Sequence, residues 1–356
     1  MSAKLVLVTG ATGHLGFRVL VEALEAGYRV KAPVRRAEQI PAIKAAPSVQ
    51  KYLNELEFVV VPDIVASGAY NTALQGVTYV IHVASPLAQQ TDNYERDVIE
   101  PATNGTIGIL KSALKIPSIK RFVFTSSLTA IVPWEFVAAK DSDKVWTGKC
   151  KQLPSKKLTN HLDQDTIASP LGPYSHYFEA YSASKALALH ATESFIAKNK
   201  PSFDVINMMP TFFIGKNELV TDIKDIENGT NALALAPLLG KQNSPLVSTT
   251  VYVNDVAKVH VLALDPKILK QGSHENFMIS SGGIEGTNFD DAIDIFQKNF
   301  PEQAKAGLFP LGGTQPVKKL KVSSERTEKV FGIKLASYET QVNSVVEHYI
   351  ELTKAT

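Results

Sequence analysis

Short apolar runs alternate with longer stretches of helical periodicity through the first part of the chain. β-Branched and apolar residues cluster in runs that predict strands at residues 4–9, 28–34, 56–62, 77–85, 120–127 and 203–210. Helices are predicted between them, most clearly at residues 13–27, 93–115 and 180–199. Strands that alternate with helices favour an α/β fold whose parallel sheet is covered on both faces. Right-handed crossovers then give a doubly wound, mostly parallel sheet.

Two regions interrupt this alternation. Residues 128–179 are irregular and rich in Lys, Asp, Pro and Ser, and an insertion of this length is usually functional or mobile. It could serve as a lid, as an interface or only as decoration. Residues 211–356 mix short helices with an apolar run at 248–264. We therefore expect one domain over residues 1–210 and mainly a smaller lobe over 211–356, with 248–264 returning to the first domain.

Composition narrows the class of protein. The chain has 356 residues, of which 44% are hydrophobic and 20% charged, as in ordinary globular proteins. Its formal net charge of +2 gives no electrostatic case for a nucleic acid or an anionic membrane as the main partner. No run approaches the roughly 18 apolar residues of a membrane span. Cys150 is the only cysteine and cannot form an internal disulfide, which favours a reducing, cytoplasmic location.

The histidines predict no metal site. None of them has the spacing of a zinc site with an acidic partner. Six of the eight are scattered over the chain as His14, His82, His161, His176, His190 and His260. We interpret them as packing or surface residues, and we expect neither metal-dependent hydrolysis nor phosphoryl transfer.

A glycine-rich turn follows the first strand. The segment VTGATGHLG places Gly10, Gly13 and Gly16 between that strand and the first helix. Gly10 would allow a tight turn, Gly13 would let the backbone approach a pyrophosphate, and Gly16 would let the helix pack close to the strand. Unpaired N–H groups at the helix N-terminus attract phosphate. This position favours a dinucleotide-binding domain of the Rossmann type over a purely structural turn, and no Lys-Ser or Lys-Thr follows to make a P-loop.

Two arginines follow the second strand, where a Rossmann domain usually carries an acidic residue. That acidic residue accepts hydrogen bonds from the adenosine 2′-hydroxyl and would repel a 2′-phosphate. Arg35 directly ends the strand, and its guanidinium can hold a phosphate through two hydrogen bonds. Arg36 would face solvent or stack on the adenine. The pair predicts NADP(H), the alternative being a solvated helix start.

A second group of polar residues predicts chemistry. Tyr181 and Lys185 lie four residues apart in a predicted helix, so their side chains share a face. A nearby ammonium would lower the pKa of the phenol and bring its proton exchange closer to neutral pH. Thr125, Ser126 and Ser127 end the fifth strand, beyond which open α/β sheets bind ligands. A hydroxyl there would hydrogen-bond a substrate carbonyl. The alternatives are a capping serine, an exposed tyrosine and a solvated lysine.

Together these segments resemble an extended short-chain dehydrogenase/reductase, close to the plant dihydroflavonol and cinnamoyl reductases and the fungal carbonyl, methylglyoxal and aldehyde reductases. The similarity covers nearly the whole chain. The matching segments are VTGATGHLG (8–16), VVVPDI (59–64), HVASP (82–86), KRFVFTSS (120–127), YSASK (181–185), YVNDVAKVH (252–260) and KVSSERTEKVFG (321–332). The resemblance implies a Rossmann domain with a smaller substrate-binding lobe, and an NADPH-dependent oxidoreductase that reduces an aldehyde or ketone.

The resemblance also implies residue roles. Hydride would pass from the nicotinamide to the carbonyl while Tyr181 donates a proton, Lys185 holds the ribose and lowers the tyrosine pKa, and Ser127 binds the carbonyl oxygen. The residues expected to contact the cofactor come from the glycine turn, the strand ends and the catalytic helix. They are Gly10, Ala11, Thr12, Gly13, His14, Leu15, Arg35, Arg36, Asp63, Ile64, Val83, Ala84, Ser85, Thr125, Tyr181, Lys185, Pro210 and Phe213. An apolar pocket, or ordinary core, is expected from Leu87, Leu128, Phe178 and Phe212, which would favour an apolar or aromatic carbonyl compound.

Three features depart from the family pattern. His14 stands where Phe or Tyr is usual, and Met209 precedes Pro210 where Asn is common. The interval between Ser127 and Tyr181 is longer than is usual in the group, which bears on the shape of the substrate mouth and not on the chemistry.

Two other functions stay open. A nucleotide-sugar epimerase or dehydratase shares the extended fold, but it retains a cofactor that is usually NAD, and the Arg35–Arg36 pair argues against it. A sensor that binds NADPH without turnover is disfavoured by the complete set of Ser127, Tyr181 and Lys185. We expect a small-molecule carbonyl substrate, and a monomer or homodimer.

Overall fold

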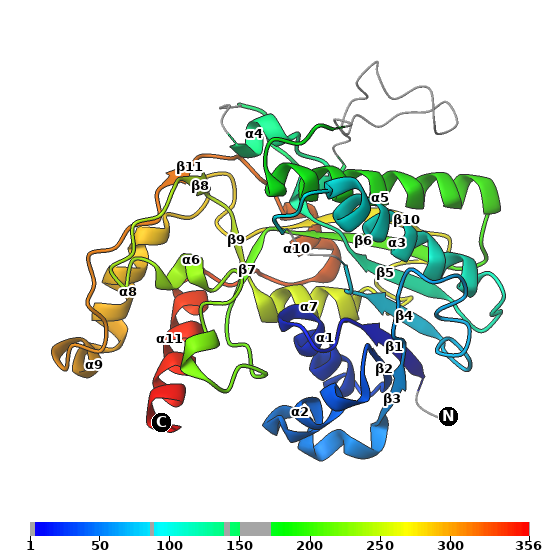
Figure 1. The fold of residues 1–356 in the computed structure, drawn as a ribbon, viewed down its shortest axis with the longest axis horizontal. Coiled ribbons are helices and arrows are strands. Elements are labelled where there is room, and N and C mark those ends of the chain that lie inside the picture. Colours follow the sequence, from blue (N-terminus) through cyan, green and yellow to red (C-terminus); the bar gives the residue numbers. More distant parts are fainter. Residues whose placement is uncertain (1–3, 86–88, 139–142, 150–171, 356) are drawn as a thin grey trace. The chain divides into compact units, whose positions relative to one another are not determined.

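The computed structural model describes residues 4–85, 89–138, 143–149 and 172–355. Within these ranges the main sheet has seven strands in the order β10-β6-β5-β4-β1-β2-β3 (Figure 1). Neighbouring strands from β3 to β6 pair in parallel, which confirms the predicted doubly wound α/β fold. The strands are β1 (Leu5–Thr9), β2 (Arg29–Val34), β3 (Leu56–Val60), β4 (Tyr79–His82), β5 (Arg121–Thr125), β6 (Asp204–Pro210) and β10 (His274–Ile279).

Strand β10 was not predicted from the sequence. Its segment, HENFMI, begins with three polar residues and therefore lacks the apolar run of the other strands. One of them finds a partner on β6, where the N–H of Val205 donates to Nδ1 of His274 at 3.2 Å. At the far end, the N–H of Thr211 donates to the carbonyl of Ile279 at 3.1 Å. From the first contact to the second, the residue numbers increase on both strands, so β10 runs parallel to β6.

The described residues also form helices and two small sheets. The longer helices are α1 (His14–Glu25), α3 (Glu100–Ala113), α5 (Tyr177–Asn199), α7 (Val253–Leu262), α8 (Ala292–Asn299) and α11 (Tyr338–Ala355). The shorter ones are α2 (Ile40–Ala45), α4 (Trp134–Ala138), α6 (Ala232–Leu235), α9 (Pro301–Lys305) and α10 (Glu325–Phe331), with single turns such as η1 (Ala37–Gln39) and η4 (Leu128–Ala130). In the small sheets β7 (Phe212–Ile214) pairs with β9 (Thr250–Tyr252), and β8 (Leu246–Val247) pairs with β11 (Val317–Lys318). No helix among the described residues is both long and apolar enough to cross a bilayer.

Helix ends follow local signals. Helix α1 stops before Gly27, which has φ +83° and whose N–H bonds to the Leu24 carbonyl, while the N–H of Tyr28 bonds to Ala23. This is a common glycine-terminated helix end, and it lies at the boundary of the helix predicted over residues 13–27.

Helix α5 begins earlier than predicted. His176 caps it, because Nδ1 of the imidazole accepts the N–H of Phe178 at 3.2 Å. The helix therefore starts at Tyr177, and Tyr181 lies in its second turn.

The chain divides into two compact units. The first comprises Met1–Trp134, Gly148–Met209 and His260–Phe277, and the second comprises Glu135–Thr147, Pro210–Val259 and Met278–Thr356. The first unit is thus discontinuous along the chain. The run expected to return, 248–264, divides between the units, and only residues 260–264 of it belong to the first.

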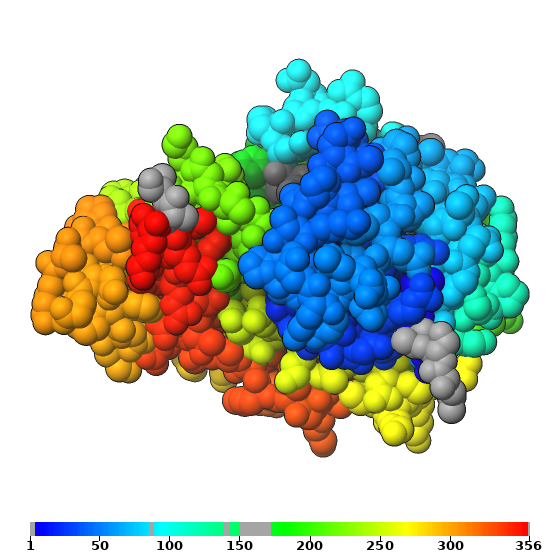
Figure 2. All heavy atoms as spheres, turned by 90° about the horizontal axis from the view of Figure 1, so that it is seen from below, coloured from blue at the N-terminus to red at the C-terminus, as the bar shows by residue number. Residues whose placement is uncertain are grey.

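Each unit has its own hydrophobic core. In the first, Leu7, Val80 and Phe122 of the sheet pack with Ile109 of α3 and Phe195 of α5. In the second, α11 supplies Val342, Val345 and Val346 to a core that also holds Phe289 and Phe296. Figure 2 shows α11, in red, beside the orange segment that carries α8 and α9.

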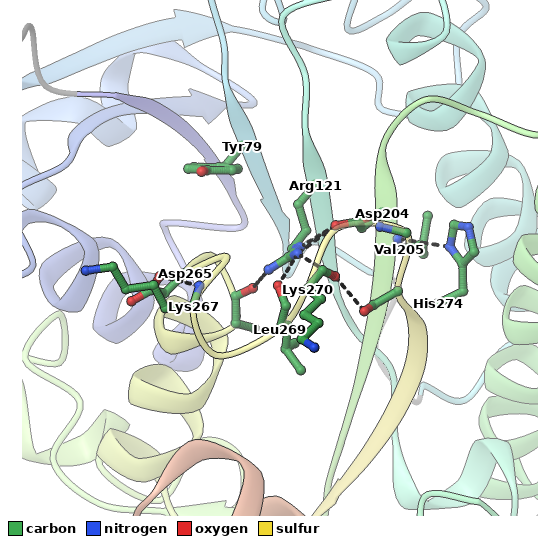
Figure 3. Close-up of polar contacts among 12 residues, drawn as sticks. Tyr79, Arg121, Asp204, Val205, Asp265, Lys267, Leu269, Lys270 and His274 are labelled. Atoms are coloured by element: carbon green, nitrogen blue, oxygen red, sulfur yellow. Dashed lines mark hydrogen bonds and ion pairs between the residues drawn. The ribbon is translucent and has the colours of Figure 1, made fainter.

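A buried ion pair lies at the amino edge of the sheet. Arg121 begins β5 and Asp204 begins β6; each is 3% exposed, and Nη2 of Arg121 lies 2.6 Å from Oδ2 of Asp204. The guanidinium also donates to the carbonyls of Ala263 and Leu269, and Oδ1 of Asp204 accepts the N–H of Gly272 (Figure 3). The pair is therefore fully hydrogen-bonded, as a buried pair must be to offset its desolvation, and it holds the returning segment on the sheet.

Candidate active site

The residues predicted to bind a ligand follow successive parallel strands. Gly10 follows β1, Arg35 follows β2, Asp63 lies shortly after β3, Val83 follows β4 and Ser126 follows β5. Because these strands are parallel, all five positions lie at one edge of the sheet. Ligands of open α/β sheets bind at this carboxyl edge.

The glycine turn has one position that packing does not explain. Gly10 has φ +77°, and a Cβ there would lie 2.9 Å from the nitrogen of Ala84. A Cβ on Gly16 would lie 2.0 Å from the carbonyl oxygen of Gly10. Gly13, in contrast, has φ −106°, and a Cβ on it would come no closer than 3.5 Å to another heavy atom of the turn. Packing therefore requires glycine at 10 and 16, whereas a Cβ on Gly13, at the N-terminus of α1, would make only an ordinary van der Waals contact.

Thr9 ties the glycine turn to the turn after β4. Its Oγ1 accepts the N–H groups of Val83 and Ala84, each at 3.1 Å, and lies 3.0 Å from Nδ1 of His82. With both lone pairs used, the hydroxyl donates its proton to Nδ1, which leaves His82 neutral with its proton on Nε2. Burial, and then the nearby charge of Lys185, lower the pKa of His82 to about 3. Thr9 lies within the segment VTGATGHLG, but the sequence suggested no role for it, because its partners lie at and just after the end of another strand.

Ser127, Tyr181 and Lys185 come together in the first unit. The side chain of Ser127 lies near the hydroxyl of Tyr181 and lowers the pKa of this phenol. The ammonium of Lys185 lies 5.4 Å from the centroid of the Tyr181 ring and donates to Oγ of Ser85 at 2.9 Å. Lys185 thereby joins the three predicted catalytic residues to the turn after β4.

The pKa of Tyr181 does not follow the expectation. Burial raises it to about 12, although the hydrogen bond with Ser127 lowers it. Burial also lowers the pKa of Lys185 to about 8. The ammonium faces the tyrosine ring and bonds to Ser85, so desolvation of the phenolate outweighs the effect of the charge. Tyr181 is thus held protonated around neutral pH.

Ser127 is both a cap and a donor. Its Oγ accepts the N–H of Thr129 at 3.2 Å and the hydroxyl of Thr129 at 3.0 Å. Because these bonds use both lone pairs, the hydroxyl of Ser127 keeps its proton for donation, and its effect on the nearby Tyr181 is to lower the pKa of that phenol. Ser127 therefore caps the turn at η4, as the sequence alternative proposed, and still has a hydroxyl proton to donate.

The end of β5 is held from two sides. The N–H of Ser126 donates to the carbonyl of Met208 on β6 at 2.7 Å. On the other side, Oγ1 of Thr125 lies 2.8 Å from Nε2 of His260, a fully buried side chain. The hydroxyl of Thr125, predicted to contact the cofactor, is thus engaged with the returning segment.

A small cavity with a mixed polar and apolar lining lies beside Lys185. It has a volume of about 30 Å³, and its lining includes Ser85, Thr125 and Asn207 as well as Phe124 and Leu189. That volume admits roughly two water molecules. The buried ammonium therefore has a few polar groups nearby besides its bond to Ser85.

The predicted adenosine contacts are exposed. The backbone N–H groups of Arg35 and Arg36 both donate to Oε1 of Gln39, which shapes the turn after β2. Among the described residues, no ion pair or hydrogen bond engages either guanidinium. The carboxylate of Asp63 accepts the N–H of Val65, two residues further along the chain, at 2.9 Å. The two arginines are therefore available to an anion.

The other predicted site residues differ in environment. In the glycine turn Ala11 and Leu15 are buried, Thr12 is exposed and His14 is intermediate. Ile64 packs against the core of the first unit. Within these surroundings only Thr12 and His14 offer side chains to a ligand.

The predicted pocket residues are not all brought together. Phe178 meets the ring of Tyr181 edge to face, with centroids 5.7 Å apart. Leu128 is buried in η4, which agrees with the alternative of ordinary core. Leu87 lies outside the described residues, and the part of the second-unit residues Pro210, Phe212 and Phe213 in the site stays a prediction. Next to Phe178, the ring of Trp134 stacks on that of Phe178 and on that of His176, and the sequence assigned neither Trp134 nor His176 to the site.

Within the described ranges no three His, Cys, Asp or Glu side chains come together as possible ligands of a metal ion. The groups that the site offers are hydroxyls, an ammonium, guanidinium groups and backbone N–H donors. These suit phosphates and a polarised carbonyl.

A family comparison matches this arrangement. The model of the NAD dependent epimerase/dehydratase family matches residues 6–276, which include the glycine turn, Ser127, Tyr181 and Lys185. The chain belongs to this family. The resemblance to the extended short-chain dehydrogenases/reductases, inferred from the motifs, is thereby confirmed.

Several named proteins are similar to this chain over most of their length. Ketoreductase CTB6 of Cercospora beticola is 34% identical over 364 residues, which cover 99% of this chain and 96% of that protein. Aldehyde reductase 2 of Sporidiobolus salmonicolor is 29% identical over 316 residues, covering 86% and 84%. Among solved structures, yeast methylglyoxal/isovaleraldehyde reductase Gre2 complexed with NADPH has the same fold, with a TM-score of 0.75 at 21% identity over 99% of this chain and 100% of that one.

Proposed function

We propose that this protein reduces an aldehyde or ketone to an alcohol with NADPH. The observation that carries the proposal is that Ser127 and Tyr181 lie together beside a lysine that is anchored on Ser85. The names of the similar proteins, a ketoreductase and an aldehyde reductase, support the same reaction class.

The first unit fits a dinucleotide with a 2′-phosphate. The exposed backbone of Gly13, at the N-terminus of α1, suits a pyrophosphate, which a Cβ would crowd. Arg35 and Arg36 present exposed guanidinium groups after β2, suited to the phosphate that distinguishes NADPH from NADH. When bound, NADPH supplies the hydride. The NADPH in the Gre2 complex supports this choice.

Three side chains of the protein carry out the proton transfer and stabilise the charges that it creates. Tyr181 is protonated at neutral pH, because burial raises its pKa to about 12, and it gives this proton to the carbonyl oxygen as the carbonyl carbon becomes saturated. Ser127 turns its hydroxyl proton to the same oxygen and stabilises the negative charge that develops there. Lys185, with a pKa of about 8, is charged at neutral pH and stabilises the tyrosinate that is left. The product is an alcohol.

The test is consumption of NADPH, followed by absorbance, with a panel of aldehydes, α-diketones and aryl ketones. We expect turnover, and we expect Tyr181→Phe to lower kcat/KM by about a thousandfold while NADPH still binds. Tyr177→Phe, in the same helix, is the matched control and should keep the activity. Full activity of Tyr181→Phe would refute the assignment of the proton donor. A nucleotide-sugar epimerase would instead convert its substrate without net consumption of NADPH.

The choice of cofactor has its own variant. Arg35→Ser should weaken NADPH binding about tenfold to a hundredfold, the loss of charge-assisted hydrogen bonds to a phosphate, and should leave NADH binding unchanged. Arg36→Ser should have the smaller effect. A wild-type preference for NADH would contradict the proposal.

A further inference from the structure

A series of aromatic rings extends from Tyr181. The ring of Phe178 meets Tyr181 with centroids 5.7 Å apart and planes at 60°. Trp134 lies 6.3 Å from Phe178 with planes 25° apart, and His176 lies 6.0 Å from Trp134 with planes 12° apart. All four residues belong to the first unit. We call Trp134, His176 and Phe178 the aromatic wall.

The aromatic wall is attached to the elements that carry the candidate catalytic residues. On one side, a buried turn leads from Ser127 to Trp134, in which the N–H of Ala130 bonds to Ser127 and the N–H of Val132 bonds to Leu128. On the other side, Phe178 stands one turn before Tyr181 in α5.

The third ring is fixed as well. Nδ1 of His176 accepts the N–H of Phe178, so the imidazole is held at the start of α5. The positions of all three rings relative to Ser127 and Tyr181 are therefore set by local, hydrogen-bonded structure.

The rings of the wall are not buried as core rings are. Phe122 of the sheet is fully buried, whereas Trp134 and Phe178 are partly exposed and His176 is exposed. Partly exposed apolar rings gain when a flat apolar group covers them, both from burial and from the preferred geometries of aromatic pairs.

We propose that the aromatic wall selects ketones with an extended planar ring system, and that Trp134 is the specificity-determining residue. The inference rests on the proposed carbonyl reduction and names its substrate class. With the carbonyl oxygen at the hydroxyl of Tyr181, a ring beside the carbonyl packs on Phe178, and a second, fused ring extends to Trp134. An unbranched alkyl chain of equal length covers the same area without the geometric gain of a ring pair.

The expected size of the effect follows from one ring pair. Such a pair is worth about a 2- to 12-fold change in kcat/KM beyond its buried area. Replacement of Trp134 should therefore change the ratio of kcat/KM for an aryl ketone to kcat/KM for an alkyl ketone. It should not merely lower both values equally.

The experiment compares 2-acetylnaphthalene with dodecan-2-one, which have the same number of carbon atoms, and uses methylglyoxal to report carbonyl reduction in general. We expect Trp134→Leu to lower the ratio of kcat/KM for the naphthyl ketone over the alkyl ketone by about 2- to 12-fold. Trp134→Phe, which keeps a ring, should retain most of the ratio. Phe136→Leu is the matched control, because Phe136 lies in the same helix but its ring contacts Trp146, and it should leave the ratio unchanged.

The outcomes separate this inference from the proposed function. A wild-type protein that reduces methylglyoxal but does not prefer the naphthyl ketone would overturn the substrate class and leave carbonyl reduction standing. Equal losses on both ketones in Trp134→Leu would also overturn it, since they would mean that Trp134 only supports the fold. No turnover of any carbonyl by the wild type would overturn the proposed function itself.

Discussion

The hydroxyl of Thr125 lies 2.8 Å from Nε2 of His260, and this contact joins the end of β5 to the segment that returns to the first unit. Ser127 follows only two residues later. The position of the residue expected to bind the carbonyl oxygen therefore depends on a histidine far along the chain.

This relationship predicts coupled effects on kcat. Thr125→Val and His260→Phe should each lower kcat about tenfold, because a small displacement of Ser127 misplaces its hydroxyl. The double variant should lose little more than either single one, since both remove the same contact. Thr125→Ser, which keeps the hydroxyl, should restore kcat. Losses that multiply in the double variant would show that the two residues act separately.

The three hydrogen bonds of Thr9 predict a loss of both stability and cofactor affinity. Thr9→Val keeps the shape of the side chain but leaves Nδ1 of His82 and the N–H groups of Val83 and Ala84 without this partner. We expect the free energy of unfolding to fall by at least about 2 kcal/mol, measured in urea, and NADPH to bind more weakly. Thr9→Ser should behave like the wild type. Unchanged stability of the valine variant would mean that the turn does not need this hydroxyl.

The glycines at 13 and 16 should respond differently to alanine. A Cβ on Gly16 would lie 2.0 Å from the oxygen of Gly10, so Gly16→Ala should destabilise the fold strongly. Gly13→Ala meets nothing closer than 3.5 Å and should change the free energy of unfolding by less than about 1 kcal/mol. If a pyrophosphate lies above Gly13, NADPH affinity should nevertheless fall at least about tenfold in that variant. Normal affinity would place the phosphates elsewhere.

The pKa of Lys185 predicts the pH dependence of NADPH binding. Burial lowers this pKa to about 8, so the ammonium is charged below that pH and loses its charge as the pH rises through it. The affinity for NADPH, measured by fluorescence, should therefore be constant around neutral pH and decrease above about pH 8. His82 cannot cause this change, since its pKa is about 3 and it stays neutral throughout. The Lys185→Met variant should bind NADPH weakly at every pH, with no further weakening above about pH 8. If its affinity still falls above that pH, another group must be responsible.

The ion pair at the amino edge predicts a large effect on stability. Asp204→Asn leaves the guanidinium of Arg121 buried without its counter-charge and should cost about 3–5 kcal/mol. The control is Glu57→Gln, which removes an exposed pair with Arg29 in the same sheet and should cost less than about 1 kcal/mol. Urea unfolding measures both, and equal small losses would mean that the buried pair contributes little.

Local patterns predicted the parts of the fold that are local in origin. The glycine turn is set by close approaches within a few residues, and the apolar strands carry their own signal. Strand β10 escaped prediction because its polar first half is satisfied by β6, a partner that periodicity does not reveal.

The candidate site divides in the same way. Ser127, Tyr181 and Lys185 are set by strand ends and helix spacing, and the structure brings them together. The pKa of Tyr181 escaped prediction because it depends on burial, which tertiary packing decides. The stacking of Trp134 on His176 likewise joins segments that are distant in sequence.

The discontinuity of the first unit sets an order of events during synthesis. Pro210–Val259 of the second unit leave the ribosome between β6 and β10. In that interval the nascent chain carries β6 as an open strand edge, and Arg121 and Asp204 lack the backbone partners that Ala263, Leu269 and Gly272 later supply. An open strand edge of this kind promotes aggregation of a growing polypeptide until its partner strand is made.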